Sequence, residues 1–595
     1  FAGASAHVQA GADGRFSATL PARPAGGPFE LQLQGKSTVT LKDVLLGDVW
    51  LASGQSNMEW ELRLAAHGER EVAAANFPRI RERHVAHRAS LRLEEDLAPA
   101  PWRPALPQHA GSFSAVAYFF AREVHRATGV PIGIVHSSWG GTHVETWTSA
   151  PGNAYDPELA ALVRRLPHDP ASFGVMRRDR FWAIARAWQG AVEPAPADVA
   201  VTAAPAFDDG AWKTLEAPRA WEEQGLDGFD GIVWARRTVE LTAAQAAGAG
   251  ELHLGAIDDC DETFVNGQRL GGNCNWDEPR RYVLPAGLLK PGRNVIAVRI
   301  TDTGGGGGFH GDAARMQLVT AAGTLPLAGP WRARVQSPLE GRGPAPNDMP
   351  TLLYNGMVHP LRGLGLRGVI WYQGESNVGR AARYQQALPA LIQDWRRVFG
   401  QPALPFYFVQ LASFLPLENN TLAGSPWAEL REAQRLTALN VLNTGMAVAI
   451  DLGDANDIHP RNKQDVGKRL ALQALAGAYG QPVHAHGPRL LKTEPRGAQI
   501  AVEFDAPQGL QARGGGPLLG FAVAQGDGPF HAARARIVGS RVVLESAAVP
   551  QPDVVRYGWF DNPSEANLVG SDGLPASPFR TDARTLLTAK GRFTP

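Results

Sequence analysis

The chain has 595 residues, in which 58 lysine and arginine side chains balance 58 aspartate and glutamate side chains. This length is too great for one hydrophobic core, so we expect about two to four domains. The balanced charge argues against nucleic acid or an acidic membrane surface as a partner, and the chain has no run of about 18 apolar residues that could span a membrane. The 66 glycines and 45 prolines indicate many turns and therefore much β structure.

The first segment, residues 1–45, is expected to be a β domain. Three stretches alternate polar and apolar residues between turns rich in glycine and proline: FSATLP, FELQLQG and STVTLKDVLL. We interpret them as part of a small sandwich.

An α/β pattern begins at Asp48 and predicts the first part of an α/β domain over residues 46–190. VWLASG is typical of a buried strand, and residues 56–75 continue as a helix. A second helix is predicted to end at Gly129, and PIGIVHSSWGG then predicts a strand that opens into a glycine turn. Strand, turn and helix in succession form the unit of an α/β sheet.

The pattern changes to short strands over residues 191–340, which predicts an inserted all-β domain. Asn266-Gly267 within ETFVNGQRLG favours a type I′ hairpin turn. Cys260 and Cys274, the only two cysteines, lie in this region. The pair is compatible with one disulfide in an oxidising compartment or with two buried thiols, and it is too small for a zinc site.

The α/β pattern resumes over residues 341–482 and completes this α/β domain, which would carry any chemistry at its strand ends. Its strands are VIWY, LPFYFVQL and GMAVAID, each followed by a helix, and the first of these helices, RYQQALPALIQDWRRVFG, is amphipathic. Residues 483–595 return to β patterns such as GAQIAVEF and SRVVLES. The predicted fold class is therefore α/β, with one parallel sheet that is interrupted by a β insertion and flanked by β segments.

Four strand ends carry polar or glycine-rich sequences. In an open parallel sheet, functional groups gather at the carboxyl ends of the strands. The four ends read GQSNM after the first strand, WGGT after the second, YQGESN after the third and DANDIHP after the last. Together they contain a serine, glycine turns, an amide and an acid beside a histidine, which are the parts of acyl transfer through a serine.

The nucleophile expected from these residues is Ser56, which follows a strand through a turn of small residues. His459 is the expected base, because an imidazole titrates near the working pH. Asp457, two residues earlier, is expected to accept a hydrogen bond from the imidazole Nδ1 and to stabilise the imidazolium.

Three donors are expected to form an oxyanion hole. They are the backbone N–H of Ser56, that of Gly140 or Gly141, and the side-chain NH2 of Gln373. Each group by itself has a plainer explanation, because a serine at a helix start is usually a cap and paired glycines are common in turns. The functional interpretation rests on their coincidence at four strand ends of one sheet.

Four long blocks resemble a known family: GDVWLASGQSNMEW, SSWGGTHVETW, VIWYQGESN and DLGDANDIHPRNKQDVGKRLA. They are similar to the signature blocks of the sialate O-acetylesterase-like carbohydrate esterases of the SGNH hydrolase superfamily. LVGSDGLPASPFRTD is similar to the usual ending of that family. The resemblance implies an SGNH (flavodoxin-like) three-layer sheet and an O-acetylesterase that needs neither cofactor nor metal.

The resemblance also assigns roles. It implies Ser56 as nucleophile, His459 as base and Gln373 at the position where the wider superfamily has asparagine. One position departs from that superfamily, which often has its acid three residues before the histidine, where this chain has Asn456. Either Asp457 completes a triad, or a dyad works with a backbone carbonyl or with another acid such as Glu375.

The insertion resembles a galactose-binding-type jelly roll, on the pieces FDDGAW, VWARRTVEL, GAIDDCDETFVNG and NVIAVRITD. Such a module can hold a glycan on an exposed tryptophan, or it can simply brace the catalytic domain. A split catalytic domain with this insertion resembles esterases of plant hemicelluloses such as xyloglucan or xylan. We therefore expect a secreted or periplasmic protein whose partner is an acetylated carbohydrate.

Three functional hypotheses are compatible with these observations and can be told apart by experiment. The first is removal of acetyl groups from acetylated hemicellulose, with O-acetylated sialic acid as the alternative substrate. The second, from another class, is a carbohydrate-binding protein without catalysis, which the set of serine, amide and histidine disfavours. The third is a lipase or thioesterase, which the polar, tryptophan-rich and glycine-rich site blocks disfavour.

Overall fold

The computed structural model describes residues 1–190, 193–339 and 343–594. The chain divides into two compact units, one of residues 1–165 with 349–593 and one of residues 166–348 with the last two residues. The insertion boundaries expected at 190/191 and 340/341 fall on residues 191–192 and 340–342, which lie outside the described residues. In the structure, the second unit begins with the segment that carries α6 (Pro170–Gln189).

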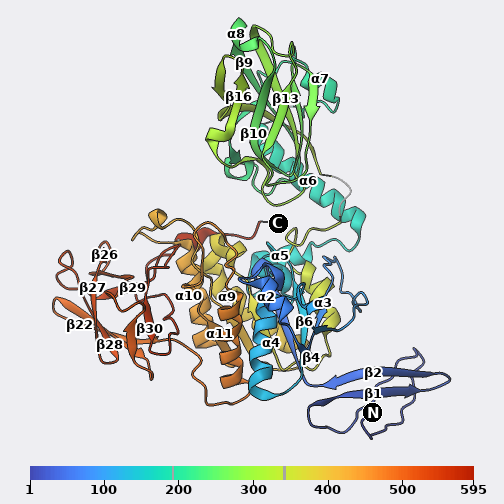
Figure 1. The fold of residues 1–595 in the computed structure, drawn as a ribbon, viewed down its shortest axis with the longest axis vertical. Coiled ribbons are helices and arrows are strands. Elements are labelled where there is room, and N and C mark those ends of the chain that lie inside the picture. Colours follow the sequence, from blue (N-terminus) through green and yellow to red (C-terminus); the bar gives the residue numbers. More distant parts are fainter. Residues whose placement is uncertain (191–192, 340–342, 595) are drawn as a thin grey trace. The chain divides into compact units, whose positions relative to one another are not determined.

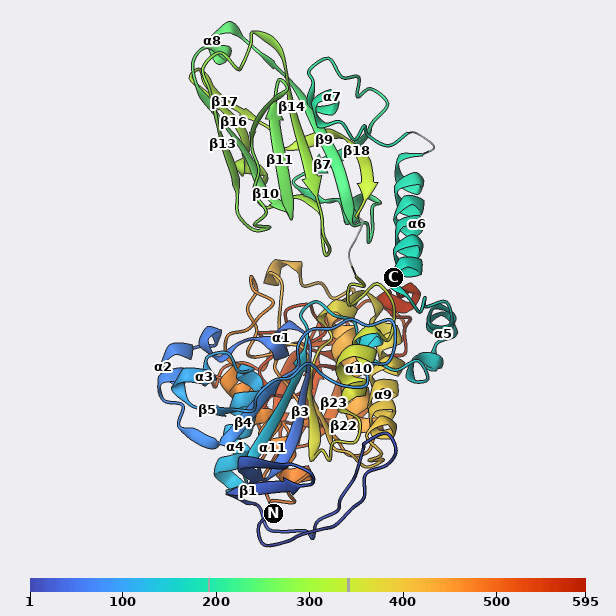
Figure 2. The same cartoon turned by 90° about the vertical axis from the view of Figure 1, so that its right-hand side faces the viewer.

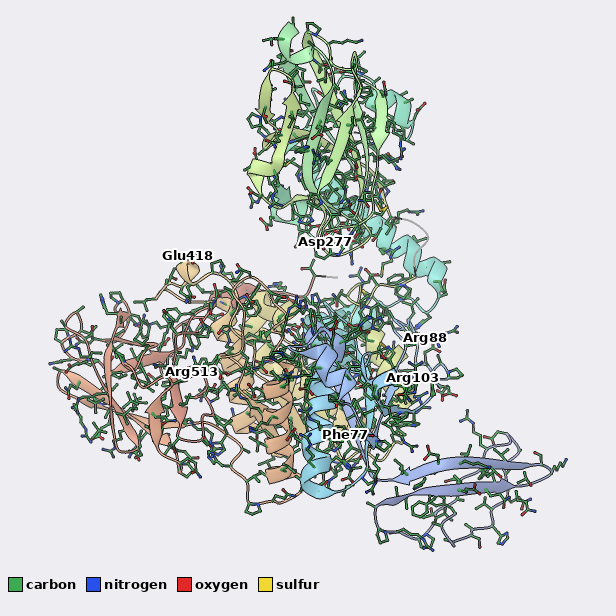
Figure 3. All side chains as sticks on the ribbon, viewed as in Figure 1. Phe77, Arg88, Arg103, Asp277, Glu418 and Arg513 are labelled. Atoms are coloured by element: carbon green, nitrogen blue, oxygen red, sulfur yellow. A yellow bond between two sulfur atoms is a disulfide. The ribbon has the colours of Figure 1, made fainter. Side chains whose placement is uncertain are left out.

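A seven-stranded sheet forms the centre of the first unit (Figure 1). Its strands in spatial order are β21 (Thr444–Ala447), β20 (Phe406–Val409), β19 (Gly368–Tyr372), β3 (Asp48–Gly54), β6 (Ile132–Ser138), β4 (Phe77–His84) and β5 (Arg103–Ala105). All neighbours are parallel except β4 and β5. Phe77 and Arg103, which begin β4 and β5, are labelled in Figure 3.

The middle strands are buried on both faces, which explains their unbroken apolar sequences. Trp50, Leu51 and Ala52 of β3 have no exposed surface. Gly54 pairs with Tyr372 on one side and with Ser138 on the other, so β19, β3 and β6 end together. The chain turns to opposite sides of β3, and this reversal is the place where ligands bind in open α/β sheets.

Helices cover both faces of this sheet (Figure 2). The long ones are α4 (Ala115–Thr128) and α11 (Lys463–Gly477), which pack together, and α9 (Ala381–Val398) and α10 (Pro426–Asn440), which pack together. Short helices are α1 (Ser56–Glu59), α2 (Gly68–Ala73), α3 (Pro107–Ala110) and α5 (Pro157–Arg164). The stop predicted at Gly129 is confirmed, because this residue caps α4 with φ 69°.

Two local predictions were wrong. FSATLP at residues 16–21 is not a strand, and the N-terminal region is one antiparallel hairpin, β1 (Gly26–Gln34) with β2 (Thr38–Leu46), rather than part of a sandwich. The helix expected over 56–75 is broken after Glu59, because Trp60 adopts φ −48° and ψ 118°.

The second unit contains two antiparallel six-stranded sheets. One consists of β17 (Gly323–Pro326), β16 (Met316–Thr320), β10 (Gly250–Asp258), β15 (Gly308–His310) and β8 (Arg219–Ala220), with β13 (Arg280–Leu284) beside β10. The other consists of β12 (Gln268–Gly271), β11 (Cys260–Val265), β14 (Gly292–Thr301), β9 (Gly231–Leu241), β18 (Gly329–Pro338) and β7 (Lys213–Ala217). Two short helices are α7 (Val199–Ala203), between α6 and β7, and α8 (Ala243–Ala246), between β9 and β10.

The helix α6 belongs to this β unit because its apolar side chains join the core between the sheets. Phe181 and Ala185 are buried in the same cluster as Trp331 of β18. The structure also joins Cys260 to Cys274 in a disulfide, which decides between the two interpretations of that pair.

The C-terminal region is β-rich, as expected. Its sheets are β22 (Arg489–Arg496), β23 (Gln499–Asp505), β28 (Arg541–Glu545) and β27 (Arg534–Val538); then β26 (His531–Ala532), β25 (Phe521–Ala524), β29 (Val554–Tyr557) and β31 (Phe579–Arg580); then β24 (Leu510–Ala512) with β30 (Leu568–Gly570). Most of these strands contribute side chains to one apolar cluster that includes Ile450, which follows β21.

Candidate active site

Ser56 lies immediately beyond the carboxyl end of β3, as the first residue of α1. The turn before it requires glycine, because Gly54 has φ 137° and a Cβ there would lie 2.1 Å from the carbonyl oxygen of Tyr372. The backbone N–H of Gln55 donates to that same carbonyl at 2.9 Å. The turn is thus fastened to β19, and the position of Ser56 is set by the sheet.

His459 lies on the loop between β21 and α11 and reaches Ser56. Its Nε2 is 2.9 Å from Ser56 Oγ, a distance at which the hydroxyl donates to a neutral imidazole. Burial, together with the charge of Lys463, lowers the pKa of His459 below its usual 6.5, while Asp457 opposes this change. The imidazole is therefore neutral at neutral pH, as a general base must be.

Asp457 is close to the other side of the imidazole. Its Oδ1 accepts the backbone N–H of His459 at 2.8 Å and lies 3.4 Å from the ring Nδ1. The second distance exceeds that of an ordinary N–H···O hydrogen bond. Asn456 is exposed, and its backbone N–H donates to Asp454.

Glu375 reaches the site through Asn57, which follows Ser56 in the chain. Asn57 Nδ2 donates to Glu375 Oε1 at 2.7 Å and to the carbonyl of Ile458, the residue before His459, at 3.0 Å. The second carboxyl oxygen of Glu375 is buried without a hydrogen-bond partner among the described residues. Asn57 therefore connects the serine turn to the histidine loop.

Lys463 completes this buried network. Its Nζ donates to Asn57 Oδ1 and lies 5.7 Å from the centre of the Trp60 ring and 5.6 Å from that of Tyr372. Lys463 has no exposed surface, and this burial lowers its pKa to about 7. Burial likewise raises the pKa of Glu375. The sequence reasoning overlooked Lys463 and Asn57, although both lie within the quoted blocks.

The glycine turn after β6 lies beside the serine. A Cβ on Gly140 would be 3.3 Å from Ser56 Cβ, and its backbone N–H donates to Glu59 Oε2 at 2.6 Å. The other oxygen of Glu59 is 2.9 Å from His87 Nε2. Burial would raise the pKa of Glu59, but the hydrogen bond and charge of His87 and the N–H of Gly140 lower it. Gly141 has φ +70° and open space where a Cβ would lie.

Gln373, the third expected oxyanion donor, makes several hydrogen bonds within the protein. Gln373 is fully buried, and its NH2 donates to the carbonyl of Thr142 at 3.0 Å and to Asn377 Oδ1 at 2.6 Å. Its Oε1 accepts from the Tyr384 hydroxyl at 2.8 Å. Both amide hydrogens have acceptors in this structure, and one of these acceptors, the carbonyl of Thr142, belongs to the residue that follows the two glycines.

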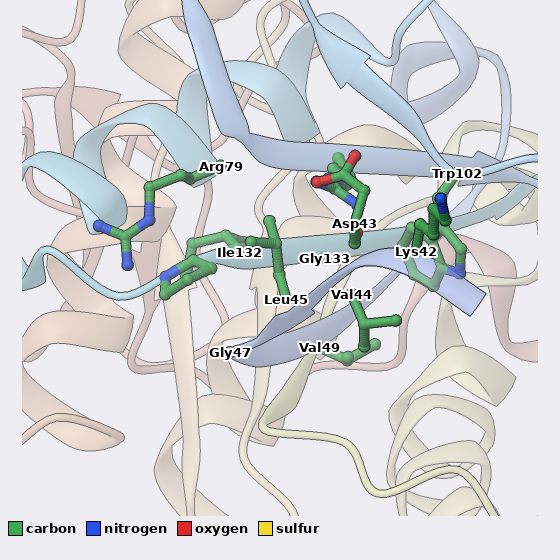
Figure 4. Close-up of a pocket in the computed structure, with 12 residues that line it drawn as sticks. Lys42, Asp43, Val44, Leu45, Gly47, Val49, Arg79, Trp102, Ile132 and Gly133 are labelled. Atoms are coloured by element: carbon green, nitrogen blue, oxygen red, sulfur yellow. The ribbon is translucent and has the colours of Figure 1, made fainter. Parts of the chain in front are cut away.

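A cavity of 510 Å³ in the same unit is not this site (Figure 4). Its lining includes Val49, Ile132 and Gly133, at the beginnings of β3 and β6. Ser56 and His459 lie past the carboxyl ends, so the cavity is at the opposite edge of the sheet. Among the described residues, no group of three or more His, Cys, Asp or Glu side chains is arranged to hold a metal ion.

The described part of the chain also contains no helix that is both long and apolar enough to cross a bilayer. Comparison with known proteins matches the family described as carbohydrate esterase, sialic acid-specific acetylesterase, over residues 46–168 and 336–476. The first range contains the strand ends GQSNM and WGGT, and the second contains YQGESN and DANDIHP.

Relatives agree with that family. The sialate O-acetylesterase of Mus musculus is 28% identical over 78% of this chain, which spans 62% of the relative's length. The sialate O-acetylesterase of Rattus norvegicus is 26% identical over 94% of this chain and 82% of the relative. A carbohydrate acetylesterase from Xanthomonas citri, known from a crystal structure, is 31% identical in sequence to this chain. The two structures superpose with a TM-score of 0.63, and the match covers 97% of this chain and 91% of the other. This chain therefore belongs to the carbohydrate esterase family of the sialic acid-specific acetylesterases, which are ester hydrolases.

Proposed function

We propose that this protein is a carbohydrate O-acetylesterase in which Ser56 is the nucleophile and His459 the general base. The observation that carries the proposal is the 2.9 Å approach of His459 Nε2 to Ser56 Oγ at the carboxyl edge of the sheet. Family membership supports the ester as substrate. The fold supports the site, because a serine and a histidine 403 residues apart meet where such sheets bind ligands.

The reaction follows from these positions. His459 Nε2 takes the proton of Ser56 Oγ as that oxygen bonds to the acetyl carbonyl carbon. The imidazolium then gives the proton to the sugar oxygen, the C–O bond breaks, and the alcohol leaves. Water attacks the acetyl-serine in the same way and releases acetate.

Two backbone N–H groups are proposed as oxyanion donors. Ser56 opens α1, so its N–H has no acceptor within that helix. Gly140 lies against Ser56, and its N–H at present donates to the carboxylate of Glu59. A developing oxyanion would take the place of that carboxylate, which requires Glu59 to move or to share the donor. Gln373 is the third proposed donor, and its NH2 would likewise have to give up one of its two present acceptors, the Thr142 carbonyl or Asn377 Oδ1.

Asp457 is proposed as the orienting acid, because it is within 3.4 Å of Nδ1 and holds the backbone of His459. Contraction of this distance in the substrate complex would give the ordinary hydrogen bond of a triad. Among the described residues, Glu375 forms no hydrogen bond with the imidazole and acts, in this proposal, through Asn57.

We further propose the SGNH arrangement for the α/β domain and a galactose-binding-type jelly roll for the second unit. The central serine strand and the parallel strand order support the first, and the paired antiparallel sheets support the second. The disulfide between Cys260 and Cys274 supports an oxidising, secreted or periplasmic location.

The proposed substrate is acetylated hemicellulose, xyloglucan or xylan, with O-acetylated sialic acid as the second candidate because two relatives are named for that activity. The test is acetate release from acetylated xyloglucan, acetylated xylan and O-acetyl sialic acid, with the wild type beside Ser56→Ala. Release from one substrate that disappears in the variant supports both enzyme and sugar class. Equal behaviour of both proteins on every substrate contradicts catalysis by Ser56.

A further inference from the structure

The carboxyl group of Glu59 lies beside the nucleophile. Glu59 is the last residue of α1, the short helix that begins with Ser56, and its Oε2 accepts the backbone N–H of Gly140 at 2.6 Å. A Cβ on Gly140 would lie 3.3 Å from Ser56 Cβ and 3.4 Å from Glu59 Oε2. The serine and the carboxyl group therefore both approach Gly140, one of the proposed oxyanion donors.

His87 holds the other oxygen of this carboxyl group. Its Nε2 is 2.9 Å from Glu59 Oε1 and 3.0 Å from the carbonyl oxygen of Ser138. Because a carbonyl oxygen and a carboxylate only accept hydrogen bonds, this Nε2 carries a hydrogen and donates it. The imidazole also stacks on Trp139, with ring centroids 4.2 Å apart and planes inclined at 5°. The N–H of Trp139 donates to the carbonyl of Gly54 at 3.1 Å, so this support is fastened to the serine turn.

The carboxyl group of Glu59 is ionised and accessible. Burial would raise its pKa, but the hydrogen bond and charge of His87 and the N–H of Gly140 lower it below the usual 4.5. At neutral pH both of its oxygens are therefore acceptors, and each needs a donor. The side chains of Glu59 and His87 are 31% and 35% exposed, so a substrate bound at Ser56 can reach them.

This carboxylate occupies a donor that catalysis needs. A hydrogen bond from an N–H to a carboxylate is about twice as strong as one between neutral groups, and breaking it without a replacement is unfavourable. The oxyanion therefore gains Gly140 most easily when the substrate itself gives Glu59 another donor. A hydroxyl group on the carbon next to the ester can do this, because neighbouring oxygens on a sugar ring lie close together. The ester that reaches Ser56 then brings this hydroxyl to Glu59.

We propose that Glu59 selects acetyl esters that have a free hydroxyl group on the neighbouring carbon, an inference that rests on the proposed esterase function of Ser56. The hydroxyl donates to Glu59 Oε2 and replaces the N–H of Gly140, which then turns to the oxyanion. His87 keeps Oε1 in place while Oε2 changes its partner. The substrate class is a monoacetylated vicinal diol, as on a partly acetylated sugar ring. A ring whose neighbouring hydroxyls are all blocked is a poor substrate.

The test compares two small esters that differ only at that hydroxyl group, 2-hydroxyethyl acetate and 2-methoxyethyl acetate. Acetate release by the full chain gives kcat/KM for each ester, and the ratio of the two values measures the preference for the hydroxyl. We expect the wild type to prefer 2-hydroxyethyl acetate about tenfold or more. Glu59→Ala removes the acceptor and should bring the ratio close to one. Because the N–H of Gly140 is free in this variant, its kcat/KM for 2-methoxyethyl acetate should not fall.

Three further variants make the test specific. Glu61→Gln is the matched control, because Glu61 is an acid of the same segment that pairs with Arg63, and it should keep the preference. His87→Phe keeps a ring against Trp139 but loses the donor to Glu59 Oε1, so it should lower the preference. Glu59→Gln keeps the size of the side chain without its charge and should give an intermediate ratio; it replaces Glu59→Ala if thermal unfolding shows that variant to be unfolded.

The proposal is overturned if the wild type does not prefer 2-hydroxyethyl acetate, if the Glu59 variants keep the full preference, or if Glu61→Gln loses it as well. Turnover of p-nitrophenyl acetate by the wild type and by Ser56→Ala is measured in parallel. Turnover that depends on Ser56 without a preference for the hydroxyl ester contradicts the role of Glu59 alone. Turnover that is equal in both proteins contradicts the esterase function itself.

Discussion

The indole of Trp60 stacks on the imidazole of His459, with ring centroids 4.9 Å apart and planes inclined at 19°. Trp60 directly follows the short helix that begins with Ser56. The backbone N–H of Trp60 donates to the Ser56 carbonyl at 2.8 Å. One segment therefore carries the serine and also the ring that orients the base. The early end of α1 has a function in this arrangement, because a continued helix would point Trp60 elsewhere.

Trp60→Ala should lower kcat about ten- to a hundredfold with a smaller change in KM, because the imidazole loses the surface that holds it near Ser56. Steady-state kinetics with p-nitrophenyl acetate measure both constants. Trp60→Phe keeps a stacking ring and serves as the matched control, with most of the activity retained. Equal losses in both variants would argue against stacking as the cause.

The acidic limb of kcat/KM against pH should have its midpoint below 6.5, since the His459 pKa is lowered and the base must be neutral. Removing the Lys463 charge with Lys463→Met should raise that pKa and move the limb to higher pH. Asp457→Asn removes the opposing negative charge and should move the limb to lower pH. Shifts in the same direction in the two variants would contradict the assignment of these charges.

Asp457→Asn should reduce kcat about ten- to a hundredfold, because the imidazolium loses the carboxylate charge that stabilises it. The expected loss of kcat is smaller than for a fully buried triad, because Asp457 Oδ1 lies 3.4 Å from the imidazole Nδ1. Glu375→Gln keeps the oxygen that accepts from Asn57 and should cost less activity than Asp457→Asn. Both variants are compared on one substrate after their unfolding midpoints have been measured. The reverse order of losses would make Glu375 the functional acid.

Gly140→Ala should lower kcat about a hundredfold with little effect on stability, because the new Cβ would lie 3.3 Å from Ser56 Cβ and crowd the acyl carbon. Gly141→Ala meets open space but has φ +70°, so its expected effect is a loss of about 1–2 kcal/mol of stability. Urea unfolding and esterase kinetics on both variants separate the two effects. A Gly140→Ala enzyme with wild-type kcat would place the oxyanion elsewhere.

Much of the site was predictable because its components occupy strand ends. Buried runs such as VWLASG identify central parallel strands, and whatever follows them must gather at one edge of the sheet. Ser56 and His459 met as expected for this reason. The helix over 56–75 was predicted incorrectly because its apolar spacing is helical, while the packing of Trp60 against His459 favours an early end.

The sequence by itself determined the succession of elements, the interrupted α/β domain and the residues at each strand end, because these depend on neighbours in the chain. Only the tertiary structure decided which partners those residues contact. Gln373 uses its N–H groups on Thr142, 231 residues away, and on Asn377, whereas Lys463 and Glu375 meet through Asn57 from distant segments. Hydrogen-bond partners are chosen by packing in three dimensions, and no local pattern of residues contains that information.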